Sequence, residues 1–459
     1  MNKTIRKANR VLIAGTNSGC GKTTVTLAVL AALKKRGVSV ASAKCGPDYI
    51  DPMFHRSALG LPSTNLDPFF FDENSLRYLI AKHSFAKHGA GKELTVIEGV
   101  MGYYDGLGLT SRASTYELAR KTASPVILTV NAKGASLSIL AQIKGFLDFL
   151  PDNDIAGVIL NNCTEKVYAA LAQEVEARLG LRPLGFMPHI KDCEIGSRHL
   201  GLITADEIDD IEKKLDLLAE QAEKSIDLDG IIELAASAPE LSFEAPVFEK
   251  REPVRIAVAR DKAFCFYYDD SLDVLKEMGA ELVSLSPLND EKLPEGIHGL
   301  YLGGGYPELY AKELSENATM RQSIRAALES GLPCLAECGG FMYLTESIAG
   351  APMVGYIPGS AHDTGRLTRF GYVKLTAKAD NMLCRAGESI PAHEFHRWDC
   401  DLTGDSFTAE KADGRSWDCV FASDTLYAGF PHFHFLANPR FAEGFITSCI
   451  KEKNRVRDN

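Results

Sequence analysis

The chain has 459 residues, 45% of them hydrophobic, and a formal net charge of −11 at pH 7. This length predicts two or more domains, and the acidic balance argues against a nucleic-acid-binding protein. No apolar run approaches the roughly 20 residues of a membrane span, and the eleven cysteines show no paired spacing. We therefore expect a cytoplasmic protein with reduced thiols and no membrane partner.

The first half alternates short apolar runs with helical patterns. Residues 11–14 predict a buried strand, and a helical pattern runs from Lys22 to Gly37. Further buried strands are predicted at 38–45, 94–102, 124–132 and 155–162, and helices at 134–150 and 166–180. This order predicts an α/β domain with a parallel sheet, whose ligands bind at the carboxyl ends of the strands.

A glycine-rich turn separates the first strand from its helix. Loop amides and a helix N-terminus bind phosphate, while Lys22 adds a mobile positive charge. Five residues separate Gly15 from the Gly21–Lys22 pair, one more than in the usual phosphate loop. A glycine turn without a ligand would leave Lys22 and the threonines after it without a role. The residues predicted to bind ATP are Gly15, Thr16, Asn17, Ser18, Gly19, Cys20, Gly21, Lys22, Thr23 and Thr24.

Acidic side chains follow two of the predicted strands. Glu98 ends the run 94–98, and Asp48 lies on the loop after the run 38–45. An acid at such a strand end can hold Mg²⁺ together with the first hydroxyl after the loop lysine. The predicted metal ligands are therefore Thr23, Asp48 and Glu98, with ordinary turn chemistry as the alternative for Asp48.

Four other residues are candidates for contact with a substrate. Asp51 shares the loop of Asp48, and Asp105 lies in the loop segment YYDGLG; for both, a turn role stays open. Arg198 and His199 form a basic pair among small residues, which alone is a weak signal.

A proline-rich segment divides the chain. Residues 206–232 read as a charged helical region, and prolines recur from Pro239 to Pro253. A second alternating series follows, with strands at 254–260 and 281–287 and a helix at 269–280. We predict a first domain over 1–236, a linker over 237–253 and a second α/β domain over 254–459.

Cys338 carries the strongest signal of the second half. The apolar run PCLAE leads into Cys338, and a helix is predicted to begin around Phe341. A nucleophile between a strand and a helix lies on a tight turn that exposes its side chain. The helix N-terminus lowers the pKa of a thiol. The backbone N–H of Gly339 can donate to an oxyanion.

A glycine triplet and a histidine complete this second site. Glycines around Gly304 follow the strand GLYL, where they let the backbone approach a reacting carbonyl closely. The base is expected later in the chain, at HEFH (393–396) or HFHF (432–435). If residues 432–435 form a strand, both of its histidines share one face and could point toward Cys338.

In their order along the chain, these segments resemble the cobyrinate a,c-diamide synthase family over nearly the whole length. The matching segments are GTNSGCGKTT, KCGPDYIDPMFH, EGVMGYYDG, SRHLGL, YLGGGYPELY, LPCLAECGGFMYL, RFGY, HEFH and HFHF. The first half resembles ATP-binding domains of the dethiobiotin-synthetase type. The second half resembles class I glutamine amidotransferase domains.

The resemblance implies ATP- and glutamine-dependent amidation of the a and c carboxylates of cobyrinate through acyl phosphates, with Mg²⁺. It implies that Cys338 hydrolyses L-glutamine and that His432 is the base, with His434 in reserve. Class I relatives commonly carry an acid two residues after this histidine; its absence here implies a Cys–His pair.

Several alternatives stay open. The tetrapyrrole substrate could be Ni-sirohydrochlorin or hydrogenobyrinate, since amidation takes place at peripheral carboxylates, and a homodimer is one possible assembly. A partition-type nucleotide switch would explain the first half but would give Cys338 no role.

Overall fold

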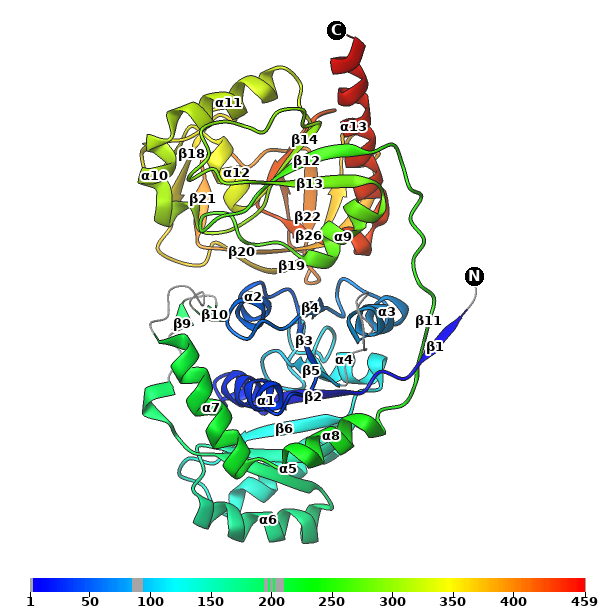
Figure 1. Ribbon diagram of the computed structural model, residues 1–459, viewed down its shortest axis with the longest axis vertical. Coiled ribbons are helices and arrows are strands. Elements are labelled where there is room, and N and C mark those ends of the chain that lie inside the picture. The colour runs from blue at the N-terminus through cyan, green and yellow to red at the C-terminus, as the bar shows by residue number, and fades with distance from the viewer. Residues whose placement is uncertain (1–2, 85–93, 194–196, 199–200, 203–209, 459) are drawn as a thin grey trace. The chain divides into compact units, whose positions relative to one another are not determined.

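The computed structural model describes residues 3–84, 94–193, 197–198, 201–202 and 210–458. The chain divides into two compact units, Met1–Ala245 and Pro246–Asn459 (Figure 1). The division lies inside the predicted linker 237–253. Within residues 237–253, β11 (Leu241–Phe243) pairs antiparallel with β1 (Thr4–Arg6) of the first unit.

A seven-stranded parallel sheet forms the centre of the first unit, in the order β4-β3-β5-β2-β6-β7-β8. Its strands are β2 (Arg10–Gly15), β3 (Val40–Cys45), β4 (Ser63–Leu66), β5 (Leu94–Glu98), β6 (Val126–Asn131), β7 (Ile155–Asn161) and β8 (Arg182–Met187). Strands β2, β3 and β5 are buried at every position, as expected for parallel strands covered on both faces. The α/β class predicted from the sequence is confirmed.

Helices and short elements connect these strands or follow β8. They are α1 (Lys22–Lys35), α2 (Ile50–Ser57), α3 (Glu73–Ser84), α4 (Thr115–Thr122), α5 (Ser138–Phe149), α6 (Glu165–Leu179), α7 (Ile211–Ser225), α8 (Leu228–Ser237), the 3₁₀ helix η1 (Lys191–Cys193), β9 (Ser197–Arg198) and β10 (Gly201–Leu202). The region 206–232, read as one helical stretch, contains two helices, because Asp227 caps α8 by accepting a hydrogen bond from the Gly230 N–H. Its first residues lie outside the described ranges.

The second unit contains a six-stranded sheet in the order β13-β12-β14-β15-β25-β24, in which β24 is antiparallel to its neighbour. Its strands are β12 (Val254–Ala259), β13 (Ala280–Leu285), β14 (Gly299–Leu302), β15 (Cys334–Glu337), β24 (Phe421–Ala422) and β25 (Leu426–Gly429). Ile256 and Val258 pack into one apolar cluster, and Ala257 and Ala259 into another. This alternation along one strand places a core on each face of the sheet.

An antiparallel sheet covers one of these faces and was not predicted from the sequence. Its order is β23-β22-β19-β20-β26, and residues such as Val373 and Ile390 share the cluster of Ile256. Its strands are β19 (Arg369–Ala377), β20 (Ser389–His396), β22 (Phe407–Glu410), β23 (Ser416–Cys419) and β26 (His432–Phe433). A smaller sheet contains β16 (Ser347–Ile348), β17 (Ala351–Pro352), β18 (Ser360–Asp363) and β21 (Trp398–Cys400).

The helices of the second unit pack into both clusters. They are α9 (Asp269–Glu277), α10 (Ala311–Glu316), α11 (Ala318–Glu329), α12 (Gly339–Leu344), α13 (Pro439–Asp458) and the 3₁₀ helices η3 (Pro307–Tyr310) and η4 (Phe435–Ala437). Helix α12 begins at Gly339, directly after Cys338, and not around Phe341 as predicted. Two consecutive glycines hid this start, because glycine is a poor helix former.

Candidate functional site

The phosphate loop joins β2 to α1 in the order that the sequence predicts. Gly21 has φ +95°, and a Cβ atom on it would lie 1.8 Å from Nδ2 of Asn161. That amide donates a hydrogen bond to the Cys20 carbonyl at 3.0 Å, so the end of β7 supports the loop. Only glycine fits at residue 21, and the loop closes directly onto the first turn of α1.

Glu98 lies fully buried at the carboxyl end of β5. Its Oε1 accepts hydrogen bonds from the Thr23 hydroxyl at 2.6 Å and from the Lys44 ammonium at 2.9 Å. Its Oε2 has no hydrogen-bond partner in the described part of the chain, although Nε2 of His55 is 3.6 Å away. A buried carboxylate oxygen of this kind needs a cation or a donor.

Lys44 and His55 are residues of this cluster that sequence reasoning left without a role. Lys44 is 4% exposed and forms ion pairs with both Asp51 and Glu98. Burial would raise the pKa of Asp51, but the Lys44 ammonium outweighs burial and lowers it. A lysine at the end of a buried apolar strand is the signal that could have identified this cluster, because a buried charge requires partners.

Asp48 is held differently from Asp51. Its carboxylate accepts hydrogen bonds from the backbone N–H groups of Ile50 at 2.8 Å and Asp51 at 3.4 Å, at the start of α2. Burial, together with the Asp51 charge, raises the pKa of Asp48 to about 7. The structure thus brings Thr23 and Glu98 into contact, while Asp51 rather than Asp48 pairs with the lysine that contacts Glu98.

The remaining substrate candidates belong to the first half of the chain. Asp105 is exposed and accepts a hydrogen bond from the Gly102 N–H at 3.0 Å, which is turn geometry. The same loop contacts the phosphate loop, because the Tyr103 N–H donates to the Gly15 carbonyl at 2.8 Å. The backbone of Arg198 pairs in β9 with β10, and His199 lies outside the described residues.

In the second unit, Cys338 occupies the turn between β15 and α12. Its backbone adopts φ 47° and ψ −103°, an uncommon conformation for a residue with a Cβ. The glycine triplet packs against this turn: a Cβ on Gly339 would lie 3.1 Å from the Gly305 nitrogen. The two segments predicted to stabilise an oxyanion, the glycine triplet and the turn at Gly339, therefore lie together beside Cys338.

His432 is the histidine that the structure brings to Cys338. Its side chain is buried, and a Cβ on Gly304 would lie 2.5 Å from Cε1 and 3.1 Å from Nε2 of its ring. Burial lowers the pKa of His432, but its hydrogen bond and attraction to Cys338, followed by those to Glu337, raise it to about 10. The thiol, the imidazole and the glycine loop thus form one cluster.

The other three histidines of the segments 393–396 and 432–435 have different surroundings. His434 does not continue β26 as expected; its Nδ1 accepts a hydrogen bond from the Leu436 N–H at 3.1 Å and caps η4. Nε2 of His393 lies 2.8 Å from the Tyr268 hydroxyl, and its ring stacks on His432 at 5.1 Å. His396 lies 3.0 Å from Glu394. These contacts favour His432 as the base.

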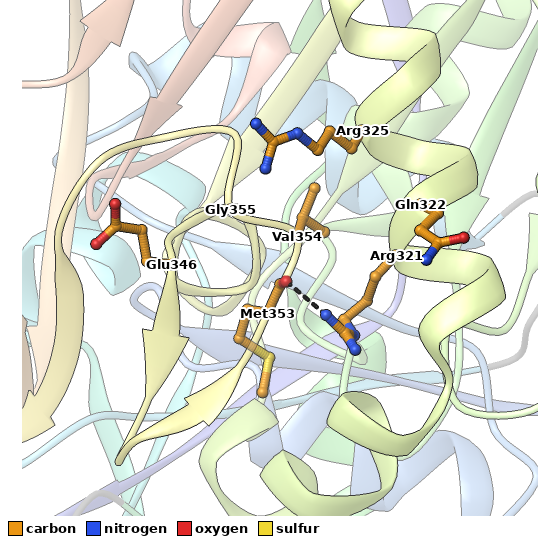
Figure 2. A pocket seen from close by; sticks show the side chains of 7 residues that line it. All are labelled: Arg321, Gln322, Arg325, Glu346, Met353, Val354 and Gly355. Atoms are coloured by element: carbon orange, nitrogen blue, oxygen red, sulfur yellow. Dashed lines mark hydrogen bonds between the residues drawn. The ribbon is translucent and has the colours of Figure 1, made fainter.

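A cavity of about 430 Å³ lies in the second unit, away from these clusters in sequence (Figure 2). Arg321 crosses it and donates hydrogen bonds to the carbonyls of Met353 at 3.0 Å and Ser315 at 2.8 Å. These bonds tie α11 to the loop after β17 and to α10, which is a structural role. No site residue predicted from the sequence lines it.

Two features are absent from the described residues. Those residues contain no helix that is both long and apolar enough to cross a membrane. Within those same ranges, no three His, Cys, Asp or Glu side chains gather as a metal site would require.

A nucleotide-binding unit followed by a cysteine–histidine unit defines the class of protein. Residues 11–203 match the CobQ/CobB/MinD/ParA nucleotide binding domain, and residues 255–440 match the CobB/CobQ-like glutamine amidotransferase domain.

Curated relatives match nearly the whole chain. A protein of Clostridium tetani is 39% identical, over 95% of this chain and 99% of its own length. A protein of Thermoplasma volcanium is 41% identical, over 97% of this chain and 98% of its own length. A protein of Priestia megaterium is 37% identical, over 98% of this chain and 99% of its own length. All three are named cobyrinate a,c-diamide synthase. The chain belongs to the cobyrinate a,c-diamide synthase family.

Proposed function

We propose that this chain amidates the a and c carboxylates of cobyrinate, using ATP and glutamine. Two observations support the proposal: the family membership over nearly the whole chain, and the presence of two distinct polar clusters in one polypeptide. A carboxylate is a poor acyl donor, so an ATP site and a source of ammonia belong together. The roles proposed are a synthetase domain over 1–236 and a glutaminase domain over 254–459.

In the glutaminase half, the Cys338 thiolate attacks the side-chain amide carbon of glutamine. His432 accepts the thiol proton and returns a proton to the departing ammonia, and water then hydrolyses the thioester. The backbone N–H groups around Gly304 and Gly339 stabilise the oxyanion of each tetrahedral intermediate. The buried cluster of thiol, imidazole and glycine loop supports these roles.

In the synthetase half, residues 15–24 bind the phosphates of ATP, and Lys22 stabilises the charge of the transferred phosphoryl group. The substrate carboxylate attacks the γ-phosphorus, which releases ADP and leaves an acyl phosphate. Ammonia then attacks the acyl carbon and displaces phosphate, giving the amide. Asp51, Asp105, Arg198 and His199 remain the candidates for contact with the tetrapyrrole.

Mg²⁺ fits the cluster at the end of β5. The buried Oε2 of Glu98 has no hydrogen-bond partner among the described residues, and the Thr23 hydroxyl contacts the same carboxylate. Mg²⁺ is commonly held by one or two carboxylates together with substrate phosphates, so a large acidic cluster is not required. Thr23, Glu98 and Asp48 would hold the ion, which would neutralise charge on the phosphates.

The test is to offer purified cobyrinate, Ni-sirohydrochlorin and hydrogenobyrinate separately with ATP and glutamine, and to count the amide groups gained by mass spectrometry. Gain of two amides by cobyrinate, dependent on ATP, is the expected result. ATP hydrolysis without any glutamine hydrolysis would indicate a nucleotide switch and would contradict the proposal.

A further inference from the structure

The carboxylate of Glu337, the residue before Cys338, lies against the imidazole of His432. Glu337 is 1% exposed. Its Oε2 accepts a hydrogen bond from the Tyr301 hydroxyl at 2.9 Å and lies 3.7 Å from Nδ1 of His432. Its Oε1 accepts a hydrogen bond from the backbone N–H of Phe433 at 3.3 Å. One buried acid therefore contacts both the ring of His432 and the backbone that follows it.

The two edges of the imidazole face different partners. Nδ1 faces Glu337, whereas Cε1 and Nε2 face Gly304 in the glycine loop. In the neutral imidazole, a carboxylate beside Nδ1 favours the tautomer with its proton on that nitrogen, which leaves Nε2 able to accept the thiol proton. Once that proton has moved, the imidazolium lies between Glu337 and the thiolate, which is the state that the raised pKa of His432 describes. The distance of 3.7 Å is slightly longer than a hydrogen bond, and such contacts commonly tighten when substrate binds.

No acid from the strand of His432 performs this task. Residues 432–435 read HFHF, and His434 caps η4. Glu337 instead reaches the histidine from the end of β15, while Tyr301 on the neighbouring β14 holds its Oε2. Burial and the Glu337 charge raise the pKa of Tyr301 well above 10, so its hydroxyl stays protonated and remains a donor.

We propose that Glu337 is a positioning residue that orients His432 and stabilises the imidazolium formed when His432 takes the Cys338 proton. The proton moves from sulfur to Nε2, and none is transferred to Glu337. The glutaminase centre is then a triad whose acid precedes the nucleophile in sequence, and not the Cys–His pair expected from the sequence. This inference rests on the proposed glutaminase function.

A purely structural role is the competing explanation. Glu337 could serve only to accept the hydrogen bonds of Tyr301 and Phe433. Glutamine at this position can still accept such bonds through its amide oxygen, but it carries no negative charge. Glu337→Gln therefore separates the two explanations.

The experiment compares purified full-length wild type and Glu337→Gln, measuring glutamine-dependent and ammonia-dependent amidation with ATP and cobyrinate. We expect kcat with glutamine to fall about 10- to 1,000-fold while KM for glutamine changes by less than about threefold. The ammonia-dependent rate should stay near wild type, which also shows that the variant folds. An unchanged kcat with glutamine would overturn the proposal.

Glu394→Gln is the matched control. Glu394 is also 1% exposed and lies beside a histidine, His396, in the same unit. The same substitution there should leave kcat with glutamine near wild type. An equal fall in both variants would show that loss of any buried carboxylate is sufficient, and the proposal would fail.

Glu337→Asp tests the proposal a second way and serves if Glu337→Gln does not fold. Aspartate keeps the charge but shortens the side chain by one methylene, so kcat with glutamine should lie between those of wild type and Glu337→Gln. If Glu337→Asp is the only variant that can be purified, a kcat with glutamine equal to that of wild type overturns the inference. Failure of the proposed function itself is distinguishable, because the wild type would then hydrolyse no glutamine.

Discussion

At the scale of single residues, the polar clusters of the two units differ in the groups that they bury. In the second unit, a thiol and an imidazole lie together beside the glycine loop. In the first unit, an ammonium and two carboxylates are paired in a site with little access to water. Because the charges serve different reactions, substitutions in the two clusters should differ in their response to the nitrogen source.

Cys338→Ala should abolish glutamine-dependent amidation and leave ammonia-dependent amidation largely intact, because ammonia bypasses glutamine hydrolysis. His432→Ala should behave in the same way, with a loss of at least about 100-fold. His434→Ala removes the cap of η4 and should mainly lower stability, by about 1 kcal/mol. The measurement is the initial rate with each nitrogen source. Selective loss of the glutamine-dependent rate in His434→Ala alone would show that the base is assigned wrongly.

Lys22→Ala and Glu98→Gln should lose amidation with both nitrogen sources, by about 100-fold or more. Lys22 supplies positive charge to the phosphates, and Glu98 contacts Thr23 at the proposed Mg²⁺ site. Glutamine hydrolysis measured without the tetrapyrrole should persist, because Cys338 belongs to the other unit. Wild-type ammonia-dependent rates in both variants would refute the assignment of the phosphate site.

Asp48 should make the stability of the protein depend on pH between about 4 and 7. Its pKa is raised to about 7 in the folded protein, above the ordinary value of 3.8, by burial and by Asp51. The folded state therefore binds a proton that the unfolded state releases, and this carboxyl's contribution to stability falls as the pH rises through that window.

Asp48→Asn removes this titration. The free energy of unfolding is compared without nucleotide and with a chelator present. The difference between variant and wild type should favour the variant more at pH 8 than at pH 5, by about 1–3 kcal/mol. The measurement is thermal unfolding at both pH values. Asp105→Asn, on an exposed loop, is the control and should show no such difference. A variant-minus-wild-type difference that is equal at both pH values would contradict the assignment.

At the scale of elements, two glycines of the phosphate loop form a matched pair. Both have positive φ, +80° at Gly19 and +95° at Gly21. A Cβ on Gly19 would meet nothing within 4 Å, whereas one on Gly21 would collide with Asn161. Gly19→Ala should cost about 1–2 kcal/mol in backbone strain alone.

Gly21→Ala should add the collision to that strain and weaken ATP binding by about tenfold or more beyond Gly19→Ala. Calorimetric titration of each variant with ATP and Mg²⁺ gives the comparison. Equal affinities in the two variants would show that the support of the loop by Asn161 has no part in binding.

The sequence predicts some of these elements far better than others. Strands β2, β3, β5, β6 and β7 were predicted because they are continuous apolar runs, and Glu98 was placed at the end of β5 because it closes such a run. Strands β4 and β8, with the sequences STNL and RPLGFM, were not predicted because they lack such a run. The antiparallel sheet β19–β20–β22–β23–β26 was not predicted, because strands such as β19 and β20 mix buried positions with partly or fully exposed ones. The glycine-rich turn and the Cys338 turn were predicted because glycines followed by a lysine, and a cysteine between a strand and a helix, are typical of such turns.

Contacts between distant residues account for what the sequence did not predict. Glu337 and Phe433 lie 96 positions apart, and no local pattern shows that they hydrogen bond. Lys44 and Glu98 lie 54 positions apart and meet because β3 and β5 pair side by side. Residue types thus predicted the chemistry of each cluster, while the pairing of strands determined which acid meets which base.

At the scale of the whole molecule, the net charge of −11 opposes a substrate that carries many carboxylates. Long-range attraction cannot recruit such a polyanion, so local cations must bind it. Several arginines of the second unit are already paired: Arg397 forms an ion pair with Asp363 at 2.8 Å, and Arg369 lies 3.9 Å from Glu394. Binding of the tetrapyrrole then depends on cations close to its carboxylates.

Raising the ionic strength should therefore raise KM for the tetrapyrrole more than KM for glutamine. Salt screens a multiply charged ligand more strongly than a zwitterion, and at about 0.15 M the screening length is only about 8 Å. The measurement is both KM values between low and high concentrations of a monovalent salt, at fixed Mg²⁺ and ATP. KM for the tetrapyrrole should rise severalfold, while that for glutamine stays nearly constant. Equal sensitivity of the two constants would show that no local cluster of cations binds the substrate.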